Sequence, residues 1–277
     1  MLIKLLRRPR FAIGISILLI ITVMAVFAPW LSPYELGEGD FTKRLCDPSA
    51  SHLLGCDING DDVLSILIWG SRTSLYVGIL TVILSMTVGI LVGLVSGFYG
   101  GVIDALLMRV VDIFMAFPGI LLAMALTALL GPSLNTIVFA ISATGWTSAA
   151  RLVRGQVLSI RTREFVQASA AFGASPIRQM LVHILPHTVT PLLVHGSFTL
   201  SGVIIVEAGL SFLGLGAQNA AQTWGSLLSQ ASELDLWASL HVSLAPGFAI
   251  FSLVMALNFI GDSLRDAFDP KFDKRLS

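Results

Sequence analysis

Few ionisable or nucleophilic side chains in this sequence lie at positions that indicate a binding or catalytic role. Two carboxylates, Asp112 and Glu207, lie in or near long apolar runs, where an ionisable group is a functional candidate by default. Arg109 lies one helical turn from Asp112, so we expect a structural ion pair there. Glu207 has no cationic neighbour in the sequence, and a functional and a structural role are equally supported for it.

The histidines and cysteines could bind a metal, but their spacings match no zinc motif. We therefore assign no metal ligand. Cys46 and Cys56 lie in one polar segment, and both a disulfide and two isolated thiols remain open. Packing or hydrogen-bonding roles are expected for the histidines, which are His52, His183, His187, His195 and His241.

Motifs for nucleotide binding or hydrolysis are absent from the sequence. It contains no Gly-x-x-x-x-Gly-Lys-Ser/Thr, no Gly-x-Ser-x-Gly and no His-Glu-x-x-His. Glycine-rich stretches at 89–101 and 209–216 favour close helix packing and a loop over a phosphate cradle. We therefore expect neither a catalytic residue nor a cofactor.

The composition of the chain is strongly apolar, and it indicates the class of protein whose elements position these residues. Apolar residues make up 55% of the 277 residues and charged residues 12%, whereas soluble domains have about 25% charged residues. Together with a mean hydropathy of +0.84, this excludes an ordinary soluble protein and a disordered chain. The 17 basic and 17 acidic residues cancel, which leaves no basic footprint for nucleic acid.

Uncharged runs are long enough to cross a lipid bilayer, which takes about 20 apolar residues. The runs are continuously apolar and do not alternate, which predicts helices and not a β-barrel. Gly131-Pro132 divides the longest run in two. We predict an all-α polytopic membrane protein with six transmembrane helices at about 11–31, 75–97, 105–129, 134–150, 188–212 and 244–262.

The distribution of lysine and arginine predicts the orientation in the membrane. With both termini inside (N-in/C-in), almost all of these residues fall in cytoplasmic segments, and the outer segments hold only Lys43 and Arg44, with Arg72 at a border. The expected parts are a cytoplasmic tail and first helix at 1–33, an extracytoplasmic segment at 34–71, a five-helix core at 72–262 and a cytoplasmic tail at 263–277.

A basic segment at 151–186 joins the fourth and fifth predicted spans on the cytoplasmic side. It predicts two short helices that meet at a tight corner. Gly173 permits the turn, Ser175-Pro176 caps and begins the second helix, and Pro186 marks the re-entry into the fifth span.

The first of these short helices, at about 163–172, carries Phe165, Ser169 and Phe172 on one face. A compact elbow with an exposed phenylalanine suits insertion into a groove of a cytoplasmic partner.

This segment resembles the EAA loop of bacterial ABC-importer permeases. Gln167-Ala168-Ser169 occupies the Glu-Ala-Ala position, with glutamine in place of the acid, and Gly173 matches the family's glycine. His183-Ile184-Leu185-Pro186 closes the motif at the expected distance, with His183 in place of an apolar residue. Gln167 can form hydrogen bonds but cannot form an ion pair with a partner.

Other segments extend the resemblance over nearly the whole chain, to the C-type subunit of the dipeptide/oligopeptide/nickel permease family. The segment from His52 to Ser65 is similar to the family's His-Pro-Leu-Gly-Thr-Asp-x-x-Gly-Arg-Asp signature, with Leu53, Cys56 and Asp61 replacing its proline, threonine and arginine. Further matches are 70–75, 108–112, 116–118, 210–216, 224–225, 246–247 and 258–266.

The resemblance implies a type I ABC-importer permease fold in the bacterial cytoplasmic membrane, and a subunit without chemistry of its own. The implied partners are a second, different permease, two cytoplasmic ATP-binding subunits and an extracytoplasmic binding protein. The implied contact with the ATPases consists of Phe165, Gln167, Ala168, Phe172 and Gly173.

The leading functional hypothesis is therefore ATP-driven import of di- and oligopeptides, with Glu207 as a candidate for the translocation path. Import of nickel or a metal–metallophore complex by the same architecture is the alternative. A more remote alternative is a secondary transporter driven by an ion gradient, in which Glu207 and Asp112 would bind the coupling ion.

Overall fold

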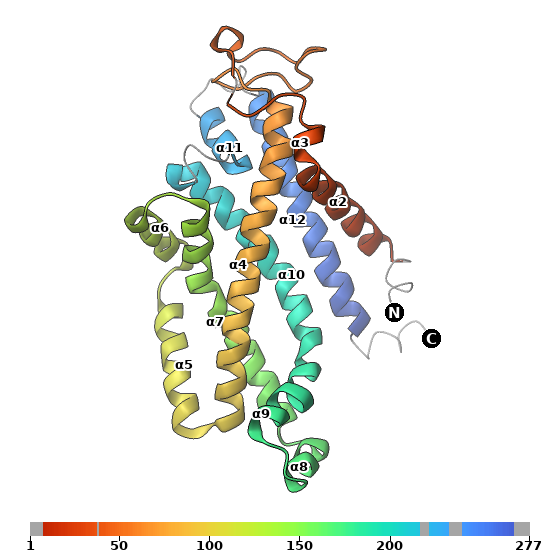
Figure 1. Cartoon of the computed structure of the whole chain (residues 1–277), viewed down its shortest axis with the longest axis vertical. Helices are drawn as coiled ribbons and strands as arrows, with labels where there is room; N and C mark the ends of the chain where they lie inside the picture. The colour runs from red at the N-terminus through yellow and green to blue at the C-terminus, as the bar shows by residue number, and fades with distance from the viewer. Residues whose placement is uncertain (1–7, 38, 217–221, 233–239, 269–277) are drawn as a thin grey trace.

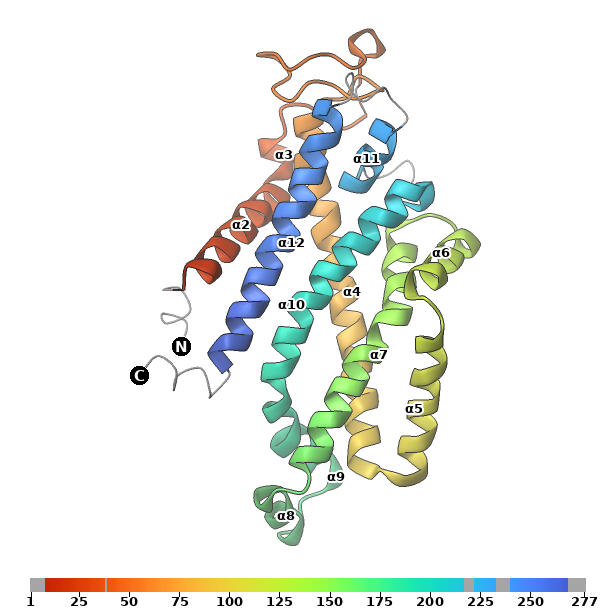
Figure 2. The same cartoon turned by 180° about the vertical axis from the view of Figure 1, so that it is seen from behind.

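A computed structural model describes residues 8–37, 39–216, 222–232 and 240–268 of the chain. Within these ranges the regular secondary structure is helical, apart from one isolated bridge between Cys56 and Asp62. The longer helices form an elongated bundle around α4 (Figures 1 and 2). They are α2 (Pro9–Val26), α4 (Val63–Tyr99), α5 (Gly101–Ala116), α6 (Gly119–Leu130), α7 (Leu134–Ile160), α10 (Leu185–Leu210) and α12 (Leu240–Phe268).

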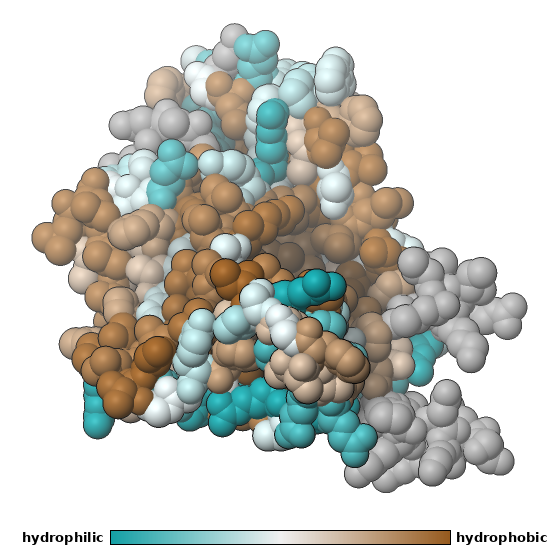
Figure 3. All heavy atoms as spheres, turned by 60° about the horizontal axis from the view of Figure 1, so that its bottom comes forward, coloured by the Kyte–Doolittle hydropathy of each residue, from teal (hydrophilic) through white to brown (hydrophobic). Residues whose placement is uncertain are grey.

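Five helical stretches are long and apolar enough to cross a membrane, and a sixth candidate is the pair α5 and α6, which bends by 82°. The space-filling view shows hydrophobic residues across the middle of the molecule, with hydrophilic residues along its lower edge and at its top (Figure 3). Six spans are therefore confirmed if the bent pair is one span. The span predicted at 105–129 is broken into α5 and α6, because Pro118 forces the preceding Phe117 into an extended conformation that ends α5.

The helix that follows the segment predicted to be extracytoplasmic starts earlier than its apolar run. Asp62 caps α4 by accepting the backbone N–H of Ser65, so α4 begins at Val63, within the segment predicted at 34–71. At the other end of the chain α12 continues to Phe268, into the predicted tail at 263–277. The rest of that tail, 269–277, and the first seven residues lie outside the described part of the chain.

Small residues bring α4 and α7 into close contact. A Cβ atom on Gly89 would lie 2.5 Å from the Cβ of Ala149, and one on Gly93 would lie 2.6 Å from the carbonyl oxygen of Ala150. A Cβ on Gly97 would lie 2.7 Å from the Cβ of Val157. The glycine-rich stretch therefore serves close helix packing, as its spacing predicts.

Residues between α3 (Ala28–Leu31) and α4 form an irregular cap at the upper end of the bundle (Figure 1). In this cap Cys46 and Cys56 form a disulfide, one of the two alternatives left open by the sequence. Asp57 is fully buried and accepts the backbone N–H groups of Asn59 and Asp61. Burial raises the pKa of the Asp57 carboxyl, since the charged form loses its hydration.

Pro186, predicted to mark the re-entry into the fifth span, does not interrupt the helix. A continuous helical stretch runs from Pro176 to Leu215, and Pro186 is the second residue of α10, directly after a π-helical turn. The preceding turn is a π-helix, η2 (Gln179–Ile184), in which the N–H of Leu185 bonds the carbonyl of Met180. The second short helix of the elbow therefore leads directly into the fifth span.

Candidate functional site

The segment between α7 and α10 folds into the predicted elbow at the lower end of the bundle (Figures 1 and 2). It consists of α8 (Glu164–Ala171), a tight turn and α9 (Pro176–Arg178). Gly173 adopts φ +82°, a backbone conformation that favours glycine. The Ser175 hydroxyl accepts the N–H of Arg178, and Pro176 occupies the first turn. The predicted corner and cap are confirmed.

One face of the elbow is anchored to the bundle. Val166, 3% exposed, packs into a hydrophobic cluster with Val157 and Ile160 of α7 and with Met180 and Ile184 of η2. A buried valine is worth roughly 1.5–3 kcal/mol relative to an exposed one. The orientation of α8 is therefore fixed by the two spanning helices that flank it.

The other face of the elbow is exposed and carries all five residues expected at the ATPase contact. Phe172 at the corner is 91% exposed and Phe165 is 39% exposed, although an aromatic side chain gains free energy when buried. Gln167, Ala168 and Gly173 are exposed as well. The five residues are thus exposed on α8 and its corner, and their contact with an ATPase stays a prediction.

Sequence reasoning missed one apolar member of this surface. Ile177 is 64% exposed and lies directly after Pro176, in the helix that forms the other arm of the corner. Its place directly after the predicted Ser175-Pro176 cap, beside the exposed corner, was a usable signal. The exposed apolar area at the corner therefore extends from Phe172 to both arms.

Gln167 makes a contact that the family's glutamate could not make. Its Nε2 donates a hydrogen bond of 3.2 Å to the carbonyl oxygen of Thr162. A carboxylate has no proton to donate to a carbonyl. The replacement of glutamate by glutamine therefore removes a charge and adds a hydrogen bond between α8 and the turn that follows α7.

Polar contacts link the elbow to the turn between α4 and α5. Arg161, at the end of α7, donates to the carbonyl oxygens of Gly97 and Phe98 at 2.9 and 3.1 Å. Two turns earlier, Arg154 donates two hydrogen bonds of 2.5 and 2.6 Å to Asp104, and Ser96 donates to the same carboxylate. Asp104 lies in the first turn of α5 and not in a loop, so movement of the elbow is connected to three spanning helices.

The predicted pair between Arg109 and Asp112 is wrong. Asp112 instead accepts a hydrogen bond of 2.5 Å from Arg151 of α7. The tertiary partner prevails because α5 packs beside α7, which places Arg151 across from Asp112. The structural role proposed for Asp112 remains, with another cation.

Glu207 lies inside the subunit, with 1% of its surface exposed. The hydroxyl of Ser74 on α4 donates to it at 3.5 Å and that of Ser211 at 2.9 Å. No salt bridge to it occurs among the described residues. Its role in the translocation path stays a prediction, and its observed contacts join α4 to the end of α10.

Two histidines of the spans make polar or ring contacts. His195 of α10 lies 3.3 Å from the hydroxyl of Ser148 on α7, which agrees with a hydrogen-bonding role. The ring of His187 lies 5.1 Å from that of Phe165, centroid to centroid, and supports the elbow from the side of α10.

Comparisons with known proteins match both parts of the chain. The family described as "Binding-protein-dependent transport system inner membrane component" matches residues 89–274. The family described as "N-terminal TM domain of oligopeptide transport permease C" matches residues 1–48. The chain belongs to the first of these families. It is therefore a multi-pass permease of the bacterial inner membrane.

The relatives of this permease cover most of its length. It is 41% identical over 264 residues to the di/tripeptide transport system permease protein DppC of Pseudomonas aeruginosa, which covers 93% of this chain and 87% of the relative. It is 38% identical over 258 residues to the dipeptide transport system permease protein DppC of Bacillus subtilis (93% and 81%). The identity to the glutathione transport system permease protein GsiD of Pectobacterium atrosepticum is 39% over 261 residues (94% and 86%).

A solved structure of the inward-facing MetNI methionine ABC transporter has a similar fold. The TM-score is 0.60 at 21% sequence identity, over 74% of this permease and 97% of that chain. At this identity the likeness concerns the fold, which is that of a type I ABC-importer permease.

Proposed function

We propose that this permease forms half of the translocation pathway of an ATP-driven, binding-protein-dependent importer of di- and oligopeptides. The observation that carries the proposal is the anchored elbow with Phe172 exposed at its corner. A rigid surface of this kind can transmit movement only to a partner that binds to it. The named peptide substrates of the relatives support peptides as cargo.

The proposed partners supply nucleotide hydrolysis, the other half of the pathway and delivery of the cargo. Two cytoplasmic ATP-binding subunits bind and hydrolyse the nucleotide and dock on the elbows, at Phe165, Gln167, Ala168, Phe172 and Gly173. A second, different permease completes the pathway, and an extracytoplasmic binding protein delivers the cargo. The N-in/C-in orientation puts the basic elbow in the cytoplasm, and it puts the disulfide on the oxidising side of the membrane, where such bonds persist.

Uptake by the reconstituted complex tests this function. Proteoliposomes that contain the permease, its partner permease and the ATPases should accumulate a labelled dipeptide only with ATP at the elbow side and with binding protein on the opposite side. Accumulation driven by a proton gradient without ATP would contradict the proposal. Nickel uptake without peptide uptake would replace peptides as the cargo, an outcome that the peptide permeases among the relatives do not favour.

A substitution of Glu207 tests its proposed place in the translocation path. Glutamine keeps the size of the side chain but offers one acceptor oxygen to the hydroxyls of Ser74 and Ser211. Because the substitution removes the negative charge that the carboxylate would offer to a cargo amine, we expect Glu207→Gln to lower the uptake rate about tenfold, which corresponds to about 1.4 kcal/mol.

Co-purification of the ATPases should be unchanged in this variant, because Glu207 lies far from the elbow along α10. The matched control is Glu35→Gln, a change of the same type at an exposed position, which should transport at the wild-type rate. Wild-type kinetics of Glu207→Gln would leave Glu207 with a packing role only.

A further inference from the structure

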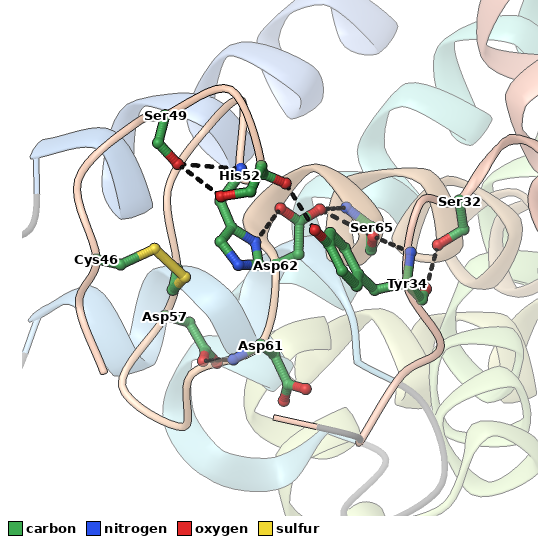
Figure 4. A network of polar contacts seen from close by, with 11 residues as sticks. Ser32, Tyr34, Cys46, Ser49, His52, Asp57, Asp61, Asp62 and Ser65 are labelled. Carbon is green, nitrogen blue, oxygen red and sulfur yellow. Dashed lines mark hydrogen bonds and ion pairs between the residues drawn. A yellow bond between two sulfur atoms is a disulfide. The ribbon is translucent and has the colours of Figure 1, made fainter. Parts of the chain in front are cut away.

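The irregular cap at the upper end of the bundle brings together three groups that bind soft metal ions. The sulfur atoms of Cys46 and Cys56 and a ring nitrogen of His52 all lie within 4.8 Å of one another. Cys56 is fully buried and His52 is 6% exposed. Figure 4 shows the imidazole of His52 between the disulfide and the carboxylate of Asp62.

His52 is held in the arrangement of a metal-binding histidine. Its Nδ1 lies 3.1 Å from Oδ1 of Asp62, whose other oxygen accepts the N–H and the hydroxyl of Ser65, each at 2.8 Å. The ring of Tyr34 stacks on the imidazole with centroids 4.8 Å apart. A carboxylate on one ring nitrogen fixes the tautomer and makes the other nitrogen a better ligand.

The free nitrogen of this histidine is buried without a partner. Nε2 of His52 has no hydrogen-bond partner in the described part of the chain. An unsatisfied buried polar atom is costly, and each such atom in a folded protein requires an explanation. A ligand for Nε2 would remove that cost.

A second histidine, beside Gly55, also has a buried ring nitrogen without a hydrogen-bond partner among the described residues. Nε2 of His241, at the start of α12, is buried and has no partner among the described residues. A Cβ on Gly55 would lie 2.9 Å from this atom, so glycine leaves the imidazole room one position before Cys56. His241 is our candidate for a fourth ligand.

We propose that this cluster is a Zn²⁺ site that opens when the disulfide is reduced. A dithiol would transfer two electrons and two protons to the disulfide, which yields two thiols and the oxidised dithiol. Zn²⁺ then displaces the two thiol protons and binds the thiolates of Cys46 and Cys56, Nε2 of His52 and the fourth ligand. Two thiolates and two imidazoles form the common tetrahedral zinc set.

The ligand spacing explains why sequence patterns did not reveal the site. His52 lies between the two cysteines in the chain, whereas the Cys2His2 zinc motif has a close pair of cysteines followed by a pair of histidines. Here backbone bonds close the loop, with the N–H of Cys56 donating to the carbonyl of Cys46 at 3.0 Å. The fourth candidate comes from another helix, which no local pattern can include.

Zinc analysis of the purified full-length permease tests the proposal without a mutation. The chain carries an affinity tag without histidine, is split into a phosphine-reduced and an untreated sample, and both receive Zn²⁺ before gel filtration. We expect about one zinc ion per chain after reduction and none without it, because the two thiolates of the proposed site exist only after the disulfide is reduced. With Co²⁺ in place of zinc, the reduced sample should show a thiolate-to-metal charge-transfer band.

Variants identify the ligands. The double variant Cys46→Ser/Cys56→Ser should lose the zinc and the cobalt band, and Asp62→Asn should bind zinc roughly 10–100-fold more weakly while it still caps α4, since asparagine is a good cap. His195→Gln, a histidine in the middle of α10, is the control and should bind as the wild type does. Equal zinc in the reduced and untreated samples, or no zinc in either, would overturn the proposal, as would full binding by the double cysteine variant.

Discussion

Replacing Phe172 by aspartate is expected to abolish recruitment of the ATPase subunits while the permease still inserts and folds. Phe172 is 91% exposed at the corner of the elbow, so the folded chain loses no packing. In the complex, the variant loses the burial of an aromatic ring, roughly 2–3 kcal/mol, and has to desolvate a carboxylate. A combined cost of about 4 kcal/mol would weaken the contact roughly a thousandfold.

Co-purification of the ATPases with the tagged permease measures this effect. Phe41→Asp is the matched control, because Phe41 is also strongly exposed, at 76%, but lies in the cap at the opposite end of the bundle. The control should recruit the ATPases as the wild type does. Recovery of the ATPases at the wild-type level from Phe172→Asp would remove the elbow as the docking surface.

The elbow was predictable because its signals are local. A glycine, a serine–proline pair and two phenylalanines fix a turn, a cap and an exposed corner within a dozen residues, and the structure has each of these features. Helical spans are predictable for the same reason, since a run of apolar residues must satisfy its backbone internally wherever it crosses lipid.

The features that the sequence did not predict depend on contacts between distant segments. Asp112 had a cation one turn away, yet it pairs with Arg151, which is 39 positions further along the chain. The burial of Glu207 likewise depends on Ser74, a residue of another helix. Propensity and periodicity rank local partners only, so the choice among distant ones required the packed structure.

Two prolines of this chain have opposite effects on the helix that contains or precedes them. Pro118 ends α5 because Phe117 becomes extended, and the helix direction changes by 82°. Pro186 produces no such break, because it falls in the first turn of α10 behind a π-helix. A proline thus predicts a disturbance, and the neighbouring turn geometry decides whether the helix bends.

The second large effect is expected from Gly93→Leu, which should prevent α4 and α7 from packing. A Cβ at this position would lie 2.6 Å from the carbonyl oxygen of Ala150, 2.7 Å from the Cβ of Val153 and 3.0 Å from the backbone nitrogen of Arg154. Two of these atoms belong to the backbone and cannot rotate away. Overpacking costs about 1–3 kcal/mol where side chains can adjust, and here the helices must separate, so we expect a larger loss.

Yield in membranes and the thermal unfolding midpoint in detergent measure this loss. Gly155→Leu is the control, because Gly155 lies on α7 and a Cβ there would meet nothing within 4 Å. The same leucine should therefore be tolerated in one helix and not in the other, although both glycines lie inside long helices. If both variants were equally stable, the contact between α4 and α7 would not be the close glycine packing described above, and the link from the elbow through Arg154 to α5 would lose its rigid support.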